Sequence, residues 1–507
     1  MLARVNSIGL MGTEGLPVSV EVDAANGLPG FELVGLPDAA VKEAKDRVRA
    51  AVRNSGVTLP PKKITANLAP GDIRKTGTHY DLAIALGLLA ADGLLPPVPE
   101  DMAVVGELAL DGALRPVKGV TALVIAAIGL GYRSVLLPRA NLPGADFIEG
   151  VALYPMDTLA QAIAALGGSQ PLTPATPKPW RGGDLGRADV CDMALIKGQF
   201  LAKRAAEIAA AGGHNLLMVG PPGAGKTMLA RAIPGILPEL TFQEALEITQ
   251  LHSLTGETVS GLAAQRPFRA PHHSSSMVAL TGGGAQMRPG EISLAHRGVL
   301  FLDELPEFPR NALEALRQPL EDGAITIARA AYHVRFPAKI MLVASMNPCP
   351  CGYHGSRQRA CRCTPLQIRR YMRRVSGPLM DRIDLQVEVD AVDYQDLMLG
   401  AAQESSAEIR ARVNRARRIQ LERYRGEAYL CNADLDSQGR ERYCALDAAG
   451  HALLSQVAER MQFSARTLTR LVKLARTIAD LSESEAIAVD HLAEAVQYRS
   501  LDRKLWT

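Results

Sequence analysis

Residues 220–227 read Gly-Pro-Pro-Gly-Ala-Gly-Lys-Thr, and this segment constrains the fold more than any other part of the chain. An apolar run, Leu216–Val219, precedes it with the composition of a short buried strand, and a helix is predicted to continue over Met228–Ile233. A Gly-x4-Gly-Lys-Thr loop between a strand and a helix is a phosphate-binding loop, in which backbone N–H groups approach phosphate oxygens at a helix N-terminus. The chain is therefore predicted to contain a parallel α/β core that binds ATP.

Within this loop the residue types predict separate roles. Lys226 is expected to reach the β- and γ-phosphates, and the hydroxyl of Thr227 is expected to bind Mg²⁺. The whole loop is assigned to nucleotide binding, with these members: Gly220, Pro221, Pro222, Gly223, Ala224, Gly225, Lys226 and Thr227.

Two further apolar strands end in polar side chains. Val299–Leu302 runs into Asp303 and Glu304, which we predict to be the magnesium carboxylate and the general base that polarises the attacking water. Ile340–Ala344 is followed by Asn347, whose amide either orients that water or caps a turn. Strands that alternate with helices predict a parallel sheet.

The length of 507 residues predicts three or four domains. A Pro- and Gly-rich stretch over 167–187 reads as a linker between an N-terminal α+β domain, 1–166, and the ATPase core, 188–395. A helical pattern over 396–507 predicts a C-terminal lid domain, and no internal repeat is visible. Other elements are predicted at Val18–Val22, Ala103–Leu110 and Ser134–Leu137 (strands) and at Val41–Asn54 and Ile196–Ala211 (helices).

The two longest apolar stretches, Leu82–Ala91 and Val120–Leu130, fall short of the ~18 residues of a membrane helix. No signal peptide is visible, so a cytoplasmic protein without a membrane partner is expected. The net charge of +3 does not by itself predict a nucleic-acid partner.

Four of the seven cysteines form a CxC-x9-CxC pattern within the segment 349–363. In a reducing compartment such a cluster favours metal binding over disulfides. We predict a structural zinc site made by four thiolates, with free reduced thiols as the alternative and His354 as a replacement ligand. The four cysteines are Cys349, Cys351, Cys361 and Cys363.

Three longer motifs make the chain recognisable: Arg266–Ser274 (RPFRAPHHS), Pro289–His296 (PGEISLAH) and Asn347–Gly352 (NPCPCG). They closely resemble the ComM/YifB family, AAA+ ATPases of the magnesium-chelatase-like group. The resemblance implies a homohexameric ring that remodels DNA independently of its sequence, with recombination proteins as further partners. For ComM it implies a helicase that promotes branch migration when transforming DNA is integrated.

The family pattern also implies residue roles. Asn347 resembles sensor 1, and Arg382 is similar to the arginine finger of MCM helicases, which acts on the neighbouring subunit's γ-phosphate. Arg466 resembles sensor 2, and Gln199 resembles the adenine-side segment. For both arginines the plain alternative is a surface salt bridge.

Two segments are candidates for DNA contact. Ile325–Pro337 reads as a hairpin that resembles the pre-sensor-1 hairpin of MCM proteins, and cations there would engage phosphates without reading sequence. The alternative is a hairpin that packs between subunits. The candidate residues are Arg329, His333 and Arg335 in this hairpin and Arg266 and Arg269 in the first motif. His272 and His273 are expected to be structural. The arginine-rich segment Arg410–Arg425 is expected to be a lid face or a subunit interface, with direct DNA contact as the alternative.

Lys75–Leu86 and Gly106–Val117 resemble the proteolytic domain of Lon, which predicts an S5-type α+β fold at the N-terminus. A Ser–Lys protease needs a hydroxyl and an amine of depressed pKa. His79 stands at the serine position and Thr121 at the lysine position, while Lys118 is three residues away. Proteolysis is therefore not expected, and DNA binding or ring organisation remain open for this domain.

One further function stays open beside the DNA motor. A chelatase-type or MoxR-like ATPase would remodel a protein partner with the same ATPase core.

Overall fold

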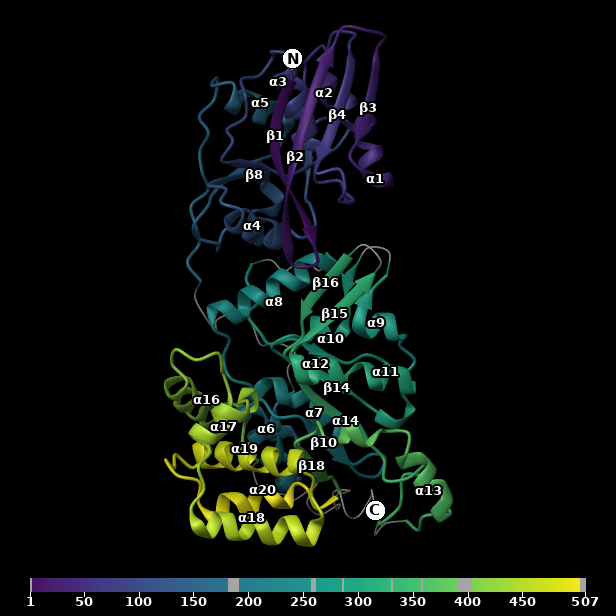
Figure 1. Cartoon of the computed structure of the whole chain (residues 1–507), viewed down its shortest axis with the longest axis vertical. Coiled ribbons are helices and arrows are strands. Elements are labelled where there is room, and N and C mark those ends of the chain that lie inside the picture. The colour runs from purple at the N-terminus through teal and green to yellow at the C-terminus, as the bar shows by residue number, and fades with distance from the viewer. Residues whose placement is uncertain are drawn as a thin grey trace.

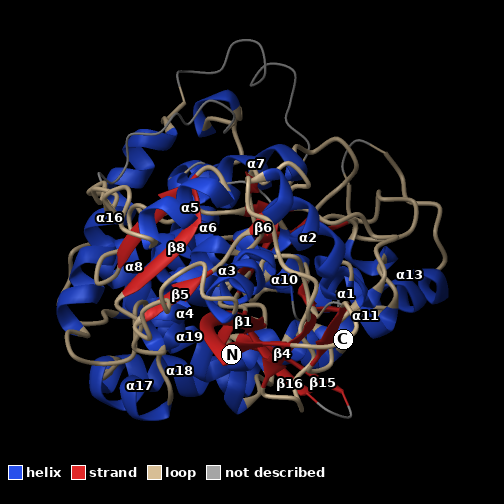
Figure 2. Cartoon of the chain, turned by 90° about the horizontal axis from the view of Figure 1, so that it is seen from above, coloured by secondary structure: helices blue, strands red, loops and turns tan. Residues whose placement is uncertain are grey.

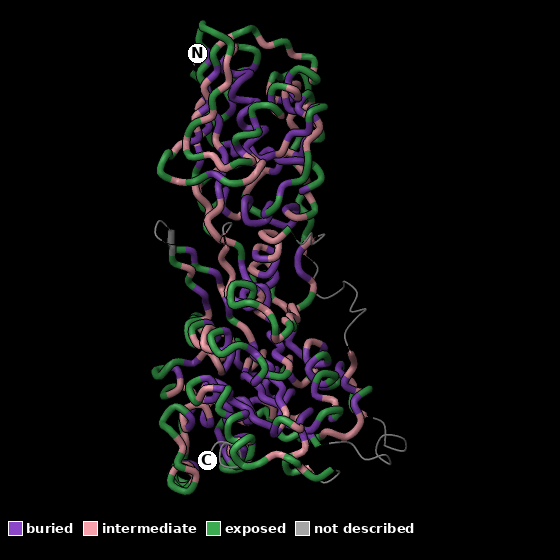
Figure 3. Tube along the Cα trace, turned by 90° about the vertical axis from the view of Figure 1, so that its right-hand side faces the viewer, coloured by how far each residue is buried: buried purple, intermediate pink, exposed green. Residues whose placement is uncertain are grey.

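The computed structural model describes residues 2–180, 191–256, 261–284, 287–329, 332–356, 359–390 and 403–501. Three parts follow one another along the long axis: the N-terminal α+β domain, the ATPase core and the helical C-terminal domain (Figure 1). Buried residues fill the interior of each part (Figure 3). None of the helices within these ranges is long and apolar enough to cross a membrane.

The N-terminal domain is built on a mixed seven-stranded sheet of order β3-β4-β2-β1-β5-β8-β9. Its strands are β1 (Leu2–Met11), β2 (Glu14–Ala25), β3 (Gly30–Val34), β4 (Lys63–Ala69), β5 (Met102–Val104), β8 (Ser134–Pro138) and β9 (Ala152–Met156). Its helices are α1 (Ala39–Lys42), α2 (Ala44–Asn54), α3 (Asp81–Ala91), α4 (Val120–Gly129) and α5 (Leu159–Leu166). Every residue of α3 is buried, because this helix lies between the sheet and α2.

Two predicted elements of this domain differ from the structure. The helix predicted over Val41–Asn54 is divided at Glu43 into α1 and α2. The strand predicted over Ala103–Leu110 is interrupted, so that β5 joins the main sheet while β6 (Glu107–Leu108) pairs with β7 (Leu114–Arg115). The spacing of apolar residues does not reveal either break, because buried apolar residues lie on both sides of each one: Val41 and Ala44 at the first, Val104 and Leu108 at the second.

The core contains a five-stranded, wholly parallel sheet of order β11-β14-β17-β10-β18. Its strands are β10 (Leu216–Val219), β11 (Phe268–Arg269), β14 (Val299–Leu302), β17 (Met341–Met346) and β18 (Leu385–Glu388). The three strands predicted next to the phosphate site are confirmed as β10, β14 and β17, which are direct neighbours. Their carboxyl ends therefore meet at one edge of the sheet.

The helices of the core include α6 (Phe200–Gly212), α7 (Lys226–Ile236), α8 (Phe242–Thr255), α13 (Pro365–Met372) and α14 (Gly377–Met380). Short helices lie between β11 and the hairpin of β15 (Ala324–Arg329) and β16 (Tyr332–Pro337): α9 (Met277–Thr281), α10 (Glu291–Leu294), α11 (Arg310–Ala315) and α12 (Arg317–Asp322). The helix predicted from Ile196 begins only at Phe200, since Gln199 has a left-handed backbone (φ 56°).

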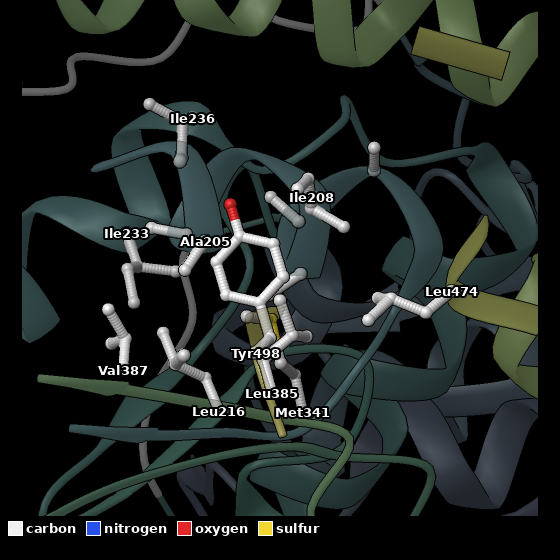
Figure 4. Packing of buried hydrophobic residues seen from close by; sticks show 14 of the residues in the cluster. Ala205, Ile208, Leu216, Ile233, Ile236, Met341, Leu385, Val387, Leu474 and Tyr498 are labelled. Carbon is white, nitrogen blue, oxygen red and sulfur yellow. The ribbon is translucent and has the colours of Figure 1, made fainter. Parts of the chain in front are cut away.

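The C-terminal domain is helical, as predicted, with α16 (Ser406–Arg423), α17 (Ser437–Tyr443), α18 (Ala448–Met461), α19 (Ala465–Leu481) and α20 (Val489–Gln497). It shares one hydrophobic core with the ATPase sheet. Tyr498, which is 1% exposed, packs among residues such as Leu216, Ile233 and Leu385 (Figure 4). Its carbonyl accepts a hydrogen bond from the Gln386 backbone N–H at 2.8 Å, which fixes the lid to the end strand of the sheet.

The arginine-rich segment lies mainly on α16, and several of its side chains bind acidic residues or carbonyls of this chain. Arg412 pairs with Glu207 and Glu404, and Arg423 donates to Asp480 at 2.6 and 3.0 Å. These contacts join α16 to α6 and α19 within the chain.

The N-terminal domain contacts the core through the tip of the β1–β2 hairpin. Gln250 Nε2 on α8 donates to the Thr13 carbonyl at 3.1 Å, and Met11 packs against a small cluster containing Val334 and Phe336 of β16. A Cβ on Gly12 would lie 2.4 Å from Val334, so the two hairpins approach each other closely at this position.

Candidate functional site

The phosphate-binding loop lies at the carboxyl edge of the core sheet. Lys226 Nζ donates to the carbonyls of Gly220 (2.7 Å) and Pro221 (2.8 Å) and to Asn347 Oδ1 (3.2 Å). Burial lowers the pKa of Lys226, and the nearby carboxylates of Asp303 and Glu304 oppose this shift. The ammonium group thus stands where β17, β14 and the loop converge, as its predicted role requires.

The glycines of the loop are required by its geometry. A Cβ on Gly220 would lie 2.0 Å from the Val389 carbonyl oxygen, which leaves no room for a side chain. Gly223 and Gly225 have φ values of +79° and +86°, a region that other residues rarely adopt. Gly225 directly precedes α7, so the loop delivers its backbone N–H groups to the start of that helix.

The predicted magnesium residues are neighbours. Thr227 Oγ1 donates to Asp303 Oδ2 at 2.8 Å, and the hydroxyl of Ser345 donates to the other oxygen of the same carboxylate. The hydroxyl in the first turn of α7 and the carboxylate directly after β14 are oxygen ligands of the kind that Mg²⁺ binds beside nucleotide phosphates. These residues therefore fit a magnesium ion.

Glu304 projects from the same edge and its side chain is 54% exposed. It has a left-handed backbone (φ 54°), and its Oε2 lies 3.5 Å from Nδ1 of His273. Sequence reasoning treated His273 as structural and missed this contact with the predicted general base. The only signal available for it was its position inside the RPFRAPHHS motif.

Gln199 bridges the loop and the segment after β18. Its Nε2 donates to the Ala224 carbonyl at 3.2 Å and to the Asp390 carbonyl at 2.5 Å. This position beside the phosphate loop is compatible with the predicted adenine-side role.

Arg382 and Arg466 lie at the other edge of the sheet. Leu216, the first residue of β10, pairs in parallel with Leu385, so Arg382 precedes the amino end of β18 while the phosphate loop follows the carboxyl end of β10. Both arginines line a cavity of about 780 Å³ at this amino edge. Neither side chain therefore belongs to the phosphate site of its own chain.

In the single chain the Arg382 side chain is folded inward and is 5% exposed. It forms an ion pair with Glu321 and donates from Nη1 to the Pro378 carbonyl at 2.6 Å, while its buried Nε has no partner among the described residues. The Arg382 guanidinium holds the pKa of Glu321 below its usual range, and the charge of Arg466 adds to this effect. Arg382 and Arg466 thus lie near each other at the amino edge of the core sheet.

Arg266, one of the residues predicted to contact DNA, is not available for that contact. Its five N–H donors are all used within the chain, by both oxygens of Glu244 and by the carbonyls of Pro238, Glu239 and Arg297. The side chain is 10% exposed. A guanidinium in this state has no donor left for a phosphate and instead holds α8 to the base of β14.

Replacing Arg266 with alanine is expected to destabilise the protein by about 3–5 kcal/mol, because the 11%-exposed Glu244 carboxylate would remain buried without its partner. Arg269→Ala is the matched control: its partner Glu291 is 32% exposed, so a loss of about 1 kcal/mol or less is expected. Urea unfolding followed by circular dichroism measures both. Equal losses would contradict this role of Arg266.

The β15–β16 hairpin is confirmed, and its faces differ. Val334 and Phe336 are buried beside Leu251 of α8 and Met11 of the N-terminal domain, whereas His333 and Arg335 alternate with them and are exposed. Arg329 ends β15 opposite Tyr332, and its side chain lies outside the described residues. Figure 2 shows the hairpin at the edge of the molecule, and the exposed side chains of His333 and Arg335 are accessible to a partner.

The four predicted metal-binding cysteines come together. Their sulfur atoms all lie within 4.8 Å of one another, with Cys349–Cys351 at 3.3 Å and Cys351–Cys361 at 3.6 Å. The cluster can hold a metal ion.

The Lon-like positions carry no protease pair. The Nε2 atom of His79 lies 3.0 Å from the Ile8 carbonyl, and burial lowers the pKa of this imidazole to about 4. Thr121 is buried and donates to the Gly144 carbonyl at 2.8 Å. Both side chains are bound to backbone carbonyls, and the two positions lack the serine hydroxyl and the lysine amine of a Ser–Lys pair.

Three family models match the chain: "Subunit ChlI of Mg-chelatase" over residues 20–141, "Magnesium chelatase, subunit ChlI" over 192–397 and "Magnesium chelatase, subunit ChlI C-terminal" over 403–499. YifB of Escherichia coli is 45% identical, over 99% of this chain and 98% of its own length. The competence protein ComM of Haemophilus influenzae is also 45% identical over the same shares. The Lon protease of Mycolicibacterium smegmatis is 28% identical over 31% of this chain and 22% of its own. The chain therefore belongs to the ComM/YifB family of magnesium-chelatase-like AAA+ ATPases.

Proposed function

We propose that this protein is a homohexameric motor that uses ATP and Mg²⁺ to move branched DNA during recombination, including the integration of transforming DNA. The name of the relative ComM, a competence protein, supports this choice. Zinc is the ion proposed for the four cysteines.

The observation that carries the proposal is the continuity between the hairpin and the nucleotide site. β16 ends at Pro337, β17 begins at Met341, and the next residue after β17 is Asn347, whose side chain accepts a hydrogen bond from Lys226. A change at the γ-phosphate is thus separated from the hairpin by the six-residue strand β17 and the three residues that precede it. Exposed cations at the hairpin would pull on phosphates without reading bases.

The position of Arg382 and Arg466 in one cavity, away from the phosphate loop of their own chain, supports a site shared between subunits. In a ring, the amino edge of one core faces the phosphate edge of its neighbour. Both cations then reach the neighbour's γ-phosphate, where an arginine stabilises the charge of the transition state. The pair between Arg382 and Glu321 must open for this contact.

The double variant His333→Ala/Arg335→Ala tests the hairpin. We expect unchanged ATP turnover without DNA, because these exposed side chains do not contact the nucleotide site, and about a tenfold or greater loss of DNA affinity at moderate salt. Arg442→Ala, an exposed arginine of α17, removes a cation elsewhere and should leave DNA affinity unchanged. Fluorescence anisotropy with single-stranded DNA measures this. Wild-type affinity in the hairpin variant would contradict the assignment.

A protein-remodelling ATPase is the other outcome of these measurements. It would show ATP turnover that does not respond to any DNA, together with no displacement of a DNA strand.

A further inference from the structure

We propose that the four-cysteine loop is a zinc site that braces the phosphate-binding loop, so that metal binding positions the nucleotide site. This inference rests on the proposed function as an ATP-driven motor, and it adds that zinc binding controls how well the chain binds ATP.

The geometry of the sulfur atoms fits zinc. Four sulfurs held at about 2.3 Å from one ion lie about 3.8 Å from one another. Here Cys349 Sγ lies 3.3 Å from Cys351 Sγ and 3.7 Å from Cys361 Sγ, and these two lie 3.6 Å apart, so a small outward adjustment creates the site. The backbone N–H of Cys363 donates to Cys361 Sγ at 3.4 Å, a contact that stabilises a thiolate.

The same loop contacts the phosphate-binding loop directly. Gly352 follows Cys351 and has a left-handed backbone (φ +87°), with its N–H donating to the Cys349 carbonyl at 2.9 Å. A Cβ on Gly352 would lie 2.5 Å from Cδ of Pro222, a member of the phosphate loop. The turn that carries two zinc ligands is therefore packed against that loop without room for one methyl group.

A second connection lies on the other side of the cysteines. The Gly220 backbone N–H donates to the Met346 carbonyl at 3.2 Å, and Asn347 accepts from Lys226 at 3.2 Å. The phosphate loop is thus held both before Cys349 and after Cys351. Closing the four sulfurs on one ion fixes the segment between these two connections, because a metal site cross-links a loop that has little core of its own.

The metal is tested on the reduced full-length protein. We expect about one zinc per chain by elemental analysis, and a visible absorption band of tetrahedral cobalt thiolate after exchange with cobalt. Chelation should weaken ATP binding reversibly, with recovery when zinc is added back. A protein without zinc that also gives no cobalt band would overturn the proposal.

The brace is tested by a matched pair of glycines. Gly352→Ala should keep zinc yet weaken ATP binding about tenfold, the size typical for residues that support a site from behind. Gly355→Ala is the control, because Gly355 also has a positive φ (+77°) but its added Cβ would meet nothing within 4 Å. ATP binding is measured with a fluorescent analogue and needs no DNA.

The outcomes separate the two claims. Equal ATP affinity of Gly352→Ala and Gly355→Ala would overturn the brace while leaving the motor unaffected. If the wild-type protein shows no DNA-dependent activity while its ATP binding still depends on zinc, only the proposed motor function is contradicted.

Discussion

Lys226→Ala is expected to reduce ATP turnover by about a hundredfold or more, since one preorganised donor to the developing charge is removed. The effect should be large because Lys226 Nζ is the cation that connects the phosphate loop with Asn347 of β17. Steady-state phosphate release with saturating Mg-ATP measures it. Strand displacement should be lost in parallel.

The loss of turnover measures an effect on ATP hydrolysis only if the Lys226→Ala protein is still folded. Lys226 is 8% exposed, and its removal frees the carbonyls of Gly220 and Pro221, so the melting temperature is measured beside activity. Lys42→Ala, an exposed lysine at the end of α1, should behave as wild type. Turnover within threefold of wild type in a folded Lys226→Ala protein would contradict the assigned site.

Arg382→Ala is expected to form the same oligomer as wild type and to lose about 10³–10⁵-fold in turnover, the range known for arginines supplied by a neighbouring subunit. The reason is geometric, because Arg382 precedes β18 at the amino edge of the sheet, opposite its own phosphate loop. Arg466→Ala should lower turnover in the same direction, since both side chains line one cavity. Size-exclusion chromatography and ATPase assays measure both effects.

Mixing two inactive variants tests the shared site more sharply. Subunits with Lys226→Ala retain Arg382, and subunits with Arg382→Ala retain Lys226. Mixed rings should therefore regain activity wherever the intact loop of one subunit faces the intact arginine of the next. No recovery in rings shown to be mixed would place Arg382 outside the shared site.

The sequence predicts those parts of the site in which a functional residue directly follows a recognisable strand. The phosphate loop, Asp303 and Asn347 each follow an apolar strand directly, and the adjacency of the parallel strands β10, β14 and β17 brings them together. The hairpin was likewise predictable, because its apolar and polar residues alternate. The cysteine spacing predicted a cluster that the structure bears out.

Contacts between distant segments were not predictable in the same way. Arg266 lies in a motif rich in cations, yet its partner Glu244 stands 22 residues earlier on α8, and only the packed fold reveals that pair. The contact of His273 with Glu304 is of the same kind, since it joins the segment after β11 to the end of β14. The contact between Gly352 and Pro222 depends on the absence of a side chain, which a sequence pattern does not convey.

The most direct measurement of the central claim is movement of a three-stranded DNA branch by the purified protein. We expect a labelled strand to be released only with hydrolysable ATP and Mg²⁺, with no release by Lys226→Ala or Arg382→Ala and reduced release by His333→Ala/Arg335→Ala. ATP turnover that is robust, does not respond to forked or three-stranded DNA and releases no strand would contradict the proposed motor.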